Sequence, residues 1–236
     1  MKAACYVLLV ALSLLPAPAR AECKVAPAPS VPALLEAARS HGASDRWSEA
    51  VATYEQLLAI EEANAEAHHE LGTALLHLRE RRARDREAAL HYTRAIELRP
   101  DRAAFYASLG DHYMRLGFRP TARAVLVAAL SFVPDGQDRF PLYMLLGALE
   151  TEERNLPAAL DRYTSARVAC GTCDGAQSLV YFHRGATLAS LVPARKSEAV
   201  LDLTRFSKQV CRGAAAARYD AECTQAMDLL QSLASP

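Results

Sequence analysis

Cys170 and Cys173 are the residues of this 236-residue chain whose spacing most resembles a chemical site. Cys-x-x-Cys at a helix N-terminus is the arrangement of thiol–disulfide exchange sites, because the helix end lowers the pKa of one thiol. Asp174 follows the pair where a c-type haem attachment motif would have histidine, which excludes that use. Periodicity places the pair after one helix and before the next, with no strand–helix–strand context. A redox site is therefore an alternative hypothesis for this chain, and not the first.

The remaining potential metal ligands do not gather in the sequence. A four-cysteine zinc site needs two close pairs of ligands, whereas Cys211 and Cys223 are separated by twelve positions with helix predicted between them. His69 and His77 share a helical face with Thr73, but eight residues of helix put them about 12 Å apart along the axis. His68, His91 and His112 fall on other faces or helices. No metal site is predicted.

Motifs of the common catalytic classes are absent from the sequence. It contains no glycine-rich phosphate loop, no His-Glu-x-x-His and no Gly-x-Ser-x-Gly. We therefore predict that the protein is not an enzyme and needs no cofactor. Lysine and arginine number 27, as do aspartate and glutamate, and this balance argues against nucleic-acid binding.

Composition and length favour a helical domain built as one unit or as one array of small units. Hydrophobic residues make up 51% of the chain, while glycine and proline number only 10 and 12, which is typical of helix-rich proteins. Residues 1–21 have a lysine near the start, a short apolar run and Ala-x-Ala at the end, as in a secretory signal peptide. The apolar run is too short to span a membrane. We expect cleavage after Ala21, export to the periplasm or beyond, and a Pro/Ala-rich lead-in over 22–30. Cys23 is interpreted as an ordinary thiol or disulfide partner, since Ala21 and Glu22 do not form a lipid-attachment signal.

The rest of the chain repeats a pattern of small and large residues. A Leu-Gly pair, or Arg-Gly in the last case, recurs within amphipathic helical stretches at Leu71-Gly72, Leu109-Gly110, Leu146-Gly147 and Arg184-Gly185. An alanine begins a second amphipathic stretch in each unit, at Ala50, Ala88, Ala122, Ala159 and Ala199. Four residues later a large side chain returns, at Tyr54, Tyr92, Leu126, Tyr163 and Leu203. Small residues allow two helices to cross closely, large ones fill the space beside them, and proline ends the second helix.

This pattern resembles the tetratricopeptide repeat (TPR) family, most closely over residues 103–136. Signature positions of a 34-residue repeat there are Tyr106, Leu109, Gly110, Tyr113, Gly117, Ala122, Ala129 and Pro134. The resemblance implies an all-α fold, a right-handed superhelical array of antiparallel helix pairs. About five units are expected over 31–213, at 31–64, 65–101, 102–136, 137–174 and 175–213, with a capping helix over 214–236. A generic antiparallel helical array is the structural alternative.

The resemblance also implies where a partner binds. In the family, fixed positions on the first helix of each unit line a concave groove that holds a protein or peptide. The corresponding residues here are His69, Thr73, His77, Asp111, Met114, Arg115, Met144 and Phe182. The Lys/Asn set with which some TPR domains bind a C-terminal carboxylate is missing, so that ligand is not predicted.

In the same repeat register, Cys211 comes within reach of Cys170 or Cys173, because the second helices of adjacent units run side by side. We expect a disulfide from that pair to Cys211, stabilising the last units by roughly 3–4 kcal/mol. Cys223 is expected to lie about nine residues into the capping helix, too far from its start to meet Cys211 easily. The leading functional hypothesis is an exported, non-catalytic scaffold that binds a protein or peptide. A redox protein and a structural subunit of an envelope assembly are the alternatives.

Overall fold

The computed structural model describes residues 29–78, 81–191, 195–212 and 216–234. The predicted signal peptide, and all but the last two residues of the predicted lead-in, lie outside the described residues. Met1–Ser30 and Val31–Pro236 are separate units, and the helices described below belong to the second. Among the described residues, no helix has both the length and the apolar character needed to cross a membrane.

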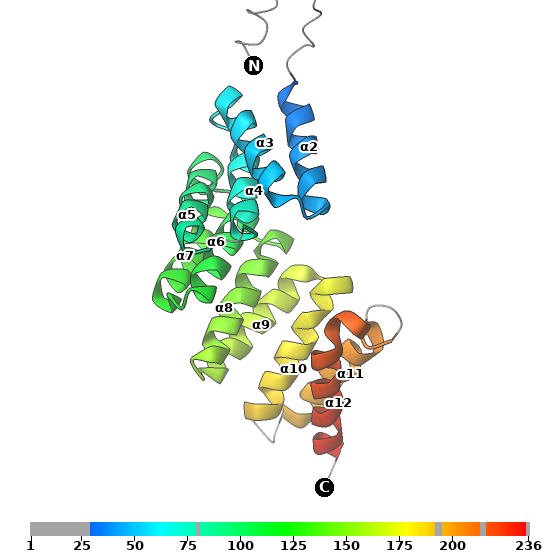
Figure 1. Ribbon diagram of the computed structural model, residues 1–236. Helices are drawn as coiled ribbons and strands as arrows, with labels where there is room; N and C mark the ends of the chain where they lie inside the picture. The colour runs from blue at the N-terminus through cyan, green and yellow to red at the C-terminus, as the bar shows by residue number, and fades with distance from the viewer. Residues whose placement is uncertain (1–28, 79–80, 192–194, 213–215, 235–236) are drawn as a thin grey trace, which may run out of the picture. The chain divides into compact units, whose positions relative to one another are not determined.

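The described part of the second unit is helical and contains no strand. Five helix pairs follow one another, and a final helix ends the chain (Figure 1). The α-helices are α2 Val31–Ala43, α3 Trp47–Ile60, α4 Ala65–Leu76, α5 Arg81–Leu98, α6 Ala103–Arg115, α7 Arg119–Phe132, α8 Phe140–Glu152, α9 Leu156–Cys170, α10 Leu179–Leu191, α11 Lys196–Gln209 and α12 Asp220–Ala234. Short 3-10 helices precede α8, α10 and α12, at Gln137–Arg139, Gly175–Ser178 and Ala216–Tyr219.

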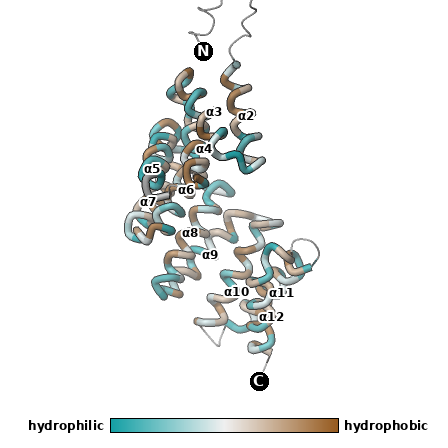
Figure 2. The backbone as a smooth tube through the Cα atoms, in the orientation of Figure 1, coloured by the Kyte–Doolittle hydropathy of each residue, from teal (hydrophilic) through white to brown (hydrophobic). Residues whose placement is uncertain are grey.

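Helix packing follows chain order. In each pair the first helix (α2, α4, α6, α8 or α10) packs against the second (α3, α5, α7, α9 or α11), and each pair packs on the next. Helix α12 packs on α10 and α11. Along the helices, apolar and polar residues alternate (Figure 2), as expected for helices that are buried on one side only. The result is an array in which each pair is stabilised chiefly by its neighbours.

The repeated glycines lie where the two helices of a pair cross. A β-carbon on Gly110 would lie 2.7 Å from the Leu126 side chain, and one on Gly147 would lie 2.5 Å from the Tyr163 ring. Both Leu126 and Tyr163 are buried. The small-and-large pattern of the sequence therefore marks the crossing points of the pairs.

Local sequence signals explain where helices begin and end. The Asn64 side chain accepts a hydrogen bond of 2.9 Å from the Ala67 N–H and so caps α4. Proline occupies the first turn of α7, α8 and α9, where its missing N–H costs nothing. Gly171 ends α9 with φ of +67°, a conformation that favours glycine.

Ion pairs join neighbouring units. Between α2 and α4, the Arg39 side chain donates to the carboxylate of Glu70 at 2.9 Å, and the Tyr54 hydroxyl donates to the same carboxylate at 2.8 Å. Between α7 and α8, Arg123 pairs with the buried Glu150 and, at 2.6 Å, with Glu153. These contacts fix the register of one pair on the next.

Candidate functional site

The cysteines are paired differently from the expectation. Cys170 forms a disulfide with Cys173, their Cα atoms 5.1 Å apart, and Cys211 forms one with Cys223, their Cα atoms 5.5 Å apart. The expected link from the Cys170/Cys173 pair to Cys211 is therefore wrong in this structure. The expectation failed because it placed the start of the last helix near residue 214. Helix α12 begins at Asp220, so Cys223 lies in its first turn, close to the end of α11.

The Cys170–Cys173 pair is poorly placed for thiol–disulfide exchange. The two side chains are 6% and 0% exposed, so an attacking thiolate cannot reach the sulfurs without local opening. Cys170 is the last residue of α9. A helix C-terminus carries negative partial charge and disfavours a thiolate, the opposite of the effect at an N-terminus. Both disulfides line one apolar cluster with residues of α10, α11 and α12, where they act as structural links.

The predicted residues on α4 are held by neighbouring helices. His69 is hydrogen-bonded through Nε2 to the Ser108 hydroxyl at 2.8 Å and packs against the rings of Tyr92 and Phe105. Burial lowers the pKa of His69. The Thr73 hydroxyl donates to the His69 carbonyl at 3.2 Å and lies 3.1 Å from the Tyr92 hydroxyl. His69 thus joins α4 to α6, and Thr73 is positioned by α5.

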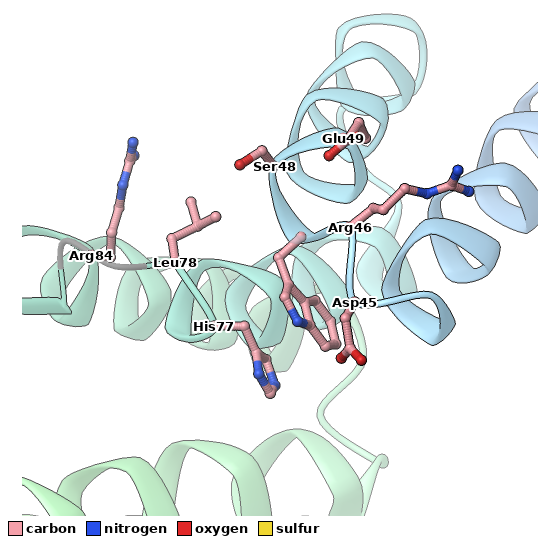
Figure 3. Close-up of a pocket in the computed structure, with 8 residues that line it drawn as sticks. Asp45, Arg46, Ser48, Glu49, His77, Leu78 and Arg84 are labelled. Atoms are coloured by element: carbon pink, nitrogen blue, oxygen red, sulfur yellow. The ribbon is translucent and has the colours of Figure 1, made fainter.

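His77 lies apart from the other predicted residues. It is exposed at the end of α4, and its imidazole stacks on the indole of Trp47, ring centroids 3.8 Å apart and planes 9° apart. Both line a cavity of about 610 Å³ between the starts of α3 and α5 and the end of α4. Figure 3 shows that the side chains lining it do not converge: Arg46 extends toward α2, and His77 points away from Ser48 and Glu49. The stack therefore fixes the turn before α3 against α4 and assembles no reactive group.

The predicted residues on α6 are at least partly accessible. Asp111 and Arg115 form an ion pair of 3.1 Å one helical turn apart, and each side chain is about half exposed. Met114 packs partly against the neighbouring apolar cluster. Tyr92 was expected only as a packing residue of the repeat, but its hydroxyl lies 3.1 Å from that of Thr73. Burial is the main cause that raises the pKa of this hydroxyl.

We define the first-helix patch as Thr73, Asp111, Met114 and Arg115, one residue from α4 and three from α6. Met144, on α8, is half-buried against the C-terminal apolar cluster and adjoins the patch only through the packing of α6 on α8. Phe182 does not belong to any exposed face. It is 5% exposed and packs against Phe206 with ring centroids 5.3 Å apart, because α11 and α12 cover this end of the array. Its prediction as a partner contact is wrong.

No group of three or more histidine, cysteine, aspartate or glutamate side chains is placed to hold a metal ion within the described residues. Arg184 and Asp202 form a buried ion pair of 2.6 Å between α10 and α11, with both side chains under 10% exposed. Burial raises the pKa of Asp202. This ion pair holds the two helices of one pair together.

Comparisons with known proteins agree at the level of the fold. No protein-family model matches the chain, and no curated protein sequence does. Among solved structures, it is similar to PilF of Pseudomonas aeruginosa, with TM-score 0.64 and 14% identity over 86% of this chain and 88% of that one. It is also similar to a thermophilic TPR protein of Thermus thermophilus, with TM-score 0.60 and 17% identity over 83% and 100%. A TPR protein described as having an unusual peptide-binding site, YrrB, matches with TM-score 0.52 and 18% identity over 77% and 92%.

The chain has the tetratricopeptide-repeat fold. The predicted class, an all-α superhelical array of antiparallel helix pairs, is confirmed, and α12 occupies the place of a capping helix. In the TPR register, the first-helix patch stands on the first helices of the second and third units. His69 and Phe182, which the family resemblance assigned to the groove, pack between helices in the structure.

Proposed function

We propose that this protein is an exported, non-catalytic TPR scaffold that binds a protein or peptide through the first-helix patch. The main support for this proposal is that Asp111 and Arg115 are half-exposed on α6, beside Met114, in a chain with the TPR fold. Arginine and methionine are residue types that anchor interfaces. A TPR protein among the similar structures is described as peptide-binding, which supports the same class of partner.

Export is supported by two features of the chain. Residues 1–21 have the composition of a signal peptide. The two disulfides, Cys170–Cys173 and Cys211–Cys223, are of the kind that persists in oxidising compartments such as the periplasm. Together they favour a location beyond the inner membrane.

A second candidate function is supported by a different surface. Four second helices each expose a large apolar side chain to solvent by 45% or more: Leu90, Val127, Val168 and Leu201. A structural subunit of an envelope assembly would bury this second-helix face instead of the first-helix patch. The two hypotheses therefore predict contacts on different helices.

Site-specific photo-crosslinking in the native host separates them. A photoreactive residue replaces Arg115 on α6, Leu90 on α5, or Gln231 on α12, so that each position is a control for the others. We expect a discrete protein adduct from Arg115 and none from Leu90 or Gln231. Adducts from Leu90 alone would favour the second candidate, the structural subunit, over the proposed scaffold. Adducts from Gln231 alone, or silence at Arg115 while the chain is folded and exported, would overturn the proposed patch.

A further inference from the structure

His68 and His91 form a close pair between the two helices of the second unit. His68 lies on α4 and is 8% exposed, and His91 lies on α5. Their Nδ1 atoms are 2.9 Å apart, and their rings stack with centroids 5.2 Å apart. Neither residue contributes to the first-helix patch.

The hydrogen bonds of His68 determine which of its nitrogens has a free lone pair. Its Nε2 lies 2.9 Å from the carbonyl oxygen of Glu62, which can only accept, so Nε2 carries the hydrogen. In neutral His68 the Nδ1 lone pair therefore faces His91. A histidine that ligates a metal is typically oriented in this way, with its second nitrogen donating to a carbonyl or carboxylate.

The surroundings keep both rings in the form that binds metals. Burial is the main cause that lowers the pKa of each histidine. The charged groups that act on the pair are Glu62 before α4 and Glu87 and Arg94 on α5. Because Glu87 is paired with Arg84, the two carboxylates are matched by two guanidinium groups, and the surroundings of the histidine pair carry no net charge.

Glu87 is not placed as a third ligand in the structure, and it becomes one only if its side chain rotates. It precedes His91 by four residues, so its side chain lies on the same face of α5 one turn away. Its carboxylate pairs with Arg84 at 2.7 Å, and its side chain is 38% exposed. Ion pairs at such exposed positions contribute little to stability. A rotation of the Glu87 side chain toward His91 is thus inexpensive.

We propose that His68 and His91 form a two-histidine site for a late first-row divalent cation such as Zn²⁺, completed by Glu87 and water. Imidazole nitrogens select such cations over Mg²⁺ and Ca²⁺. Tetrahedral ligands at the usual Zn–N length are about 3.4 Å apart, so the two rings need to separate only slightly. His91 binds by moving its proton from Nδ1 to Nε2, and no net proton is lost from the pair. The bound cation would join α4 to α5.

Zinc titration of the full mature chain tests this site. We expect calorimetry at pH 7.5 to show one Zn²⁺ bound per chain and thermal unfolding to shift upward with added Zn²⁺. His91→Gln should weaken binding by about tenfold or more and abolish the thermal shift, because it removes a ligand. Glu87→Gln should weaken binding less. His77→Gln, in the same unit but stacked on Trp47, is the matched control and should bind as the wild type does.

Two results would overturn the site. One is equal Zn²⁺ affinity in the wild type and in His91→Gln, each confirmed as folded by circular dichroism. The other is a wild type whose unfolding temperature does not respond to Zn²⁺ while His91→Gln is less stable at every zinc concentration. The pair would then be a hydrogen bond only. His68→Gln serves as a second variant, and its circular dichroism shows whether loss of this more buried side chain disturbs the fold.

Discussion

Four buried or half-buried histidines make the stability of this protein sensitive to acid. Burial is the largest cause of a lowered pKa at His68, His69, His91 and His183. At His69, Glu66 and Glu70 oppose this effect, and Arg102 adds to it. Each of these histidines binds a proton more readily in the unfolded chain, where its pKa is about 6.5. Protonation therefore favours unfolding.

Above pH 6.5, we expect these histidines to add no pH dependence to the free energy of unfolding. As the pH drops from 6.5 toward their folded-state pKa values, the free energy of unfolding should fall, because the unfolded chain binds protons first. Urea unfolding at pH 7.5, 6.5 and 5.5 measures the slope. His69→Gln keeps a hydrogen-bonding group near Ser108 but does not titrate, so its slope should be smaller than that of the wild type. Identical slopes in the two proteins would show that His69 is not a source of the acid sensitivity.

At the scale of helices, the crossing of α8 and α9 tolerates no added atom. A methyl group on Gly147 would meet the ring carbons of Tyr163, which is 2% exposed and stacked on His183. Gly147→Ala should therefore destabilise the protein by about 1–2 kcal/mol, because overpacking outweighs the better helix propensity of alanine. Chemical denaturation gives the value.

A double-mutant cycle identifies the cause of that loss. In a Tyr163→Val background the ring is absent, and Gly147→Ala should become neutral or stabilising. If Gly147→Ala costs the same in both backgrounds, contact with the Tyr163 ring is not what disfavours it.

The repeat architecture could be predicted from the sequence because its signals are local. Leu-Gly pairs, the alanines that follow and the proline after the second helix are each read within one helix pair, and the helices formed accordingly. Contacts that depend on exact helix ends could not be predicted. Cys211 meets Cys223 because a 3-10 turn at Ala216–Tyr219 delays α12 until Asp220, and the sequence carries no strong cap signal for that delay.

The candidate site was predictable only in part, for a related reason. The family register places a residue on the first-helix face but does not say what packs over it. Asp111 and Arg115 remain accessible, whereas α11 and α12 cover Phe182 and α6 supplies the hydroxyl that holds His69. Helix α12 and helix α6 lie outside the units whose residues they cover, so the sequence of those units alone does not reveal these contacts.

At the scale of the whole molecule, the Cys211–Cys223 disulfide links the last helix to the array. Replacing both residues with serine should cost about 3 kcal/mol if the loop-closure account holds for this short loop. Because each helix pair is stabilised chiefly by its neighbours, we expect the loss of hydrogen-exchange protection to be concentrated in α12 and the adjoining α10 and α11.

The matched control is the double serine variant of Cys170 and Cys173, whose closed loop is much shorter and should stabilise less. It should leave exchange from α12 unchanged. A non-reduced peptide map checks the pairing directly: recovery of Cys211 linked to Cys170 or Cys173, in place of Cys223, would contradict this account.

The solvent-facing side of α12 determines how such arrays can assemble. Apart from Met227, its exposed residues are chiefly small or polar, among them Thr224, Gln225, Asp228 and Gln231. A further helix pair, whether from another molecule or from a duplicated segment, would find little apolar surface on which to stack. End-to-end growth into filaments is thereby disfavoured at this terminus.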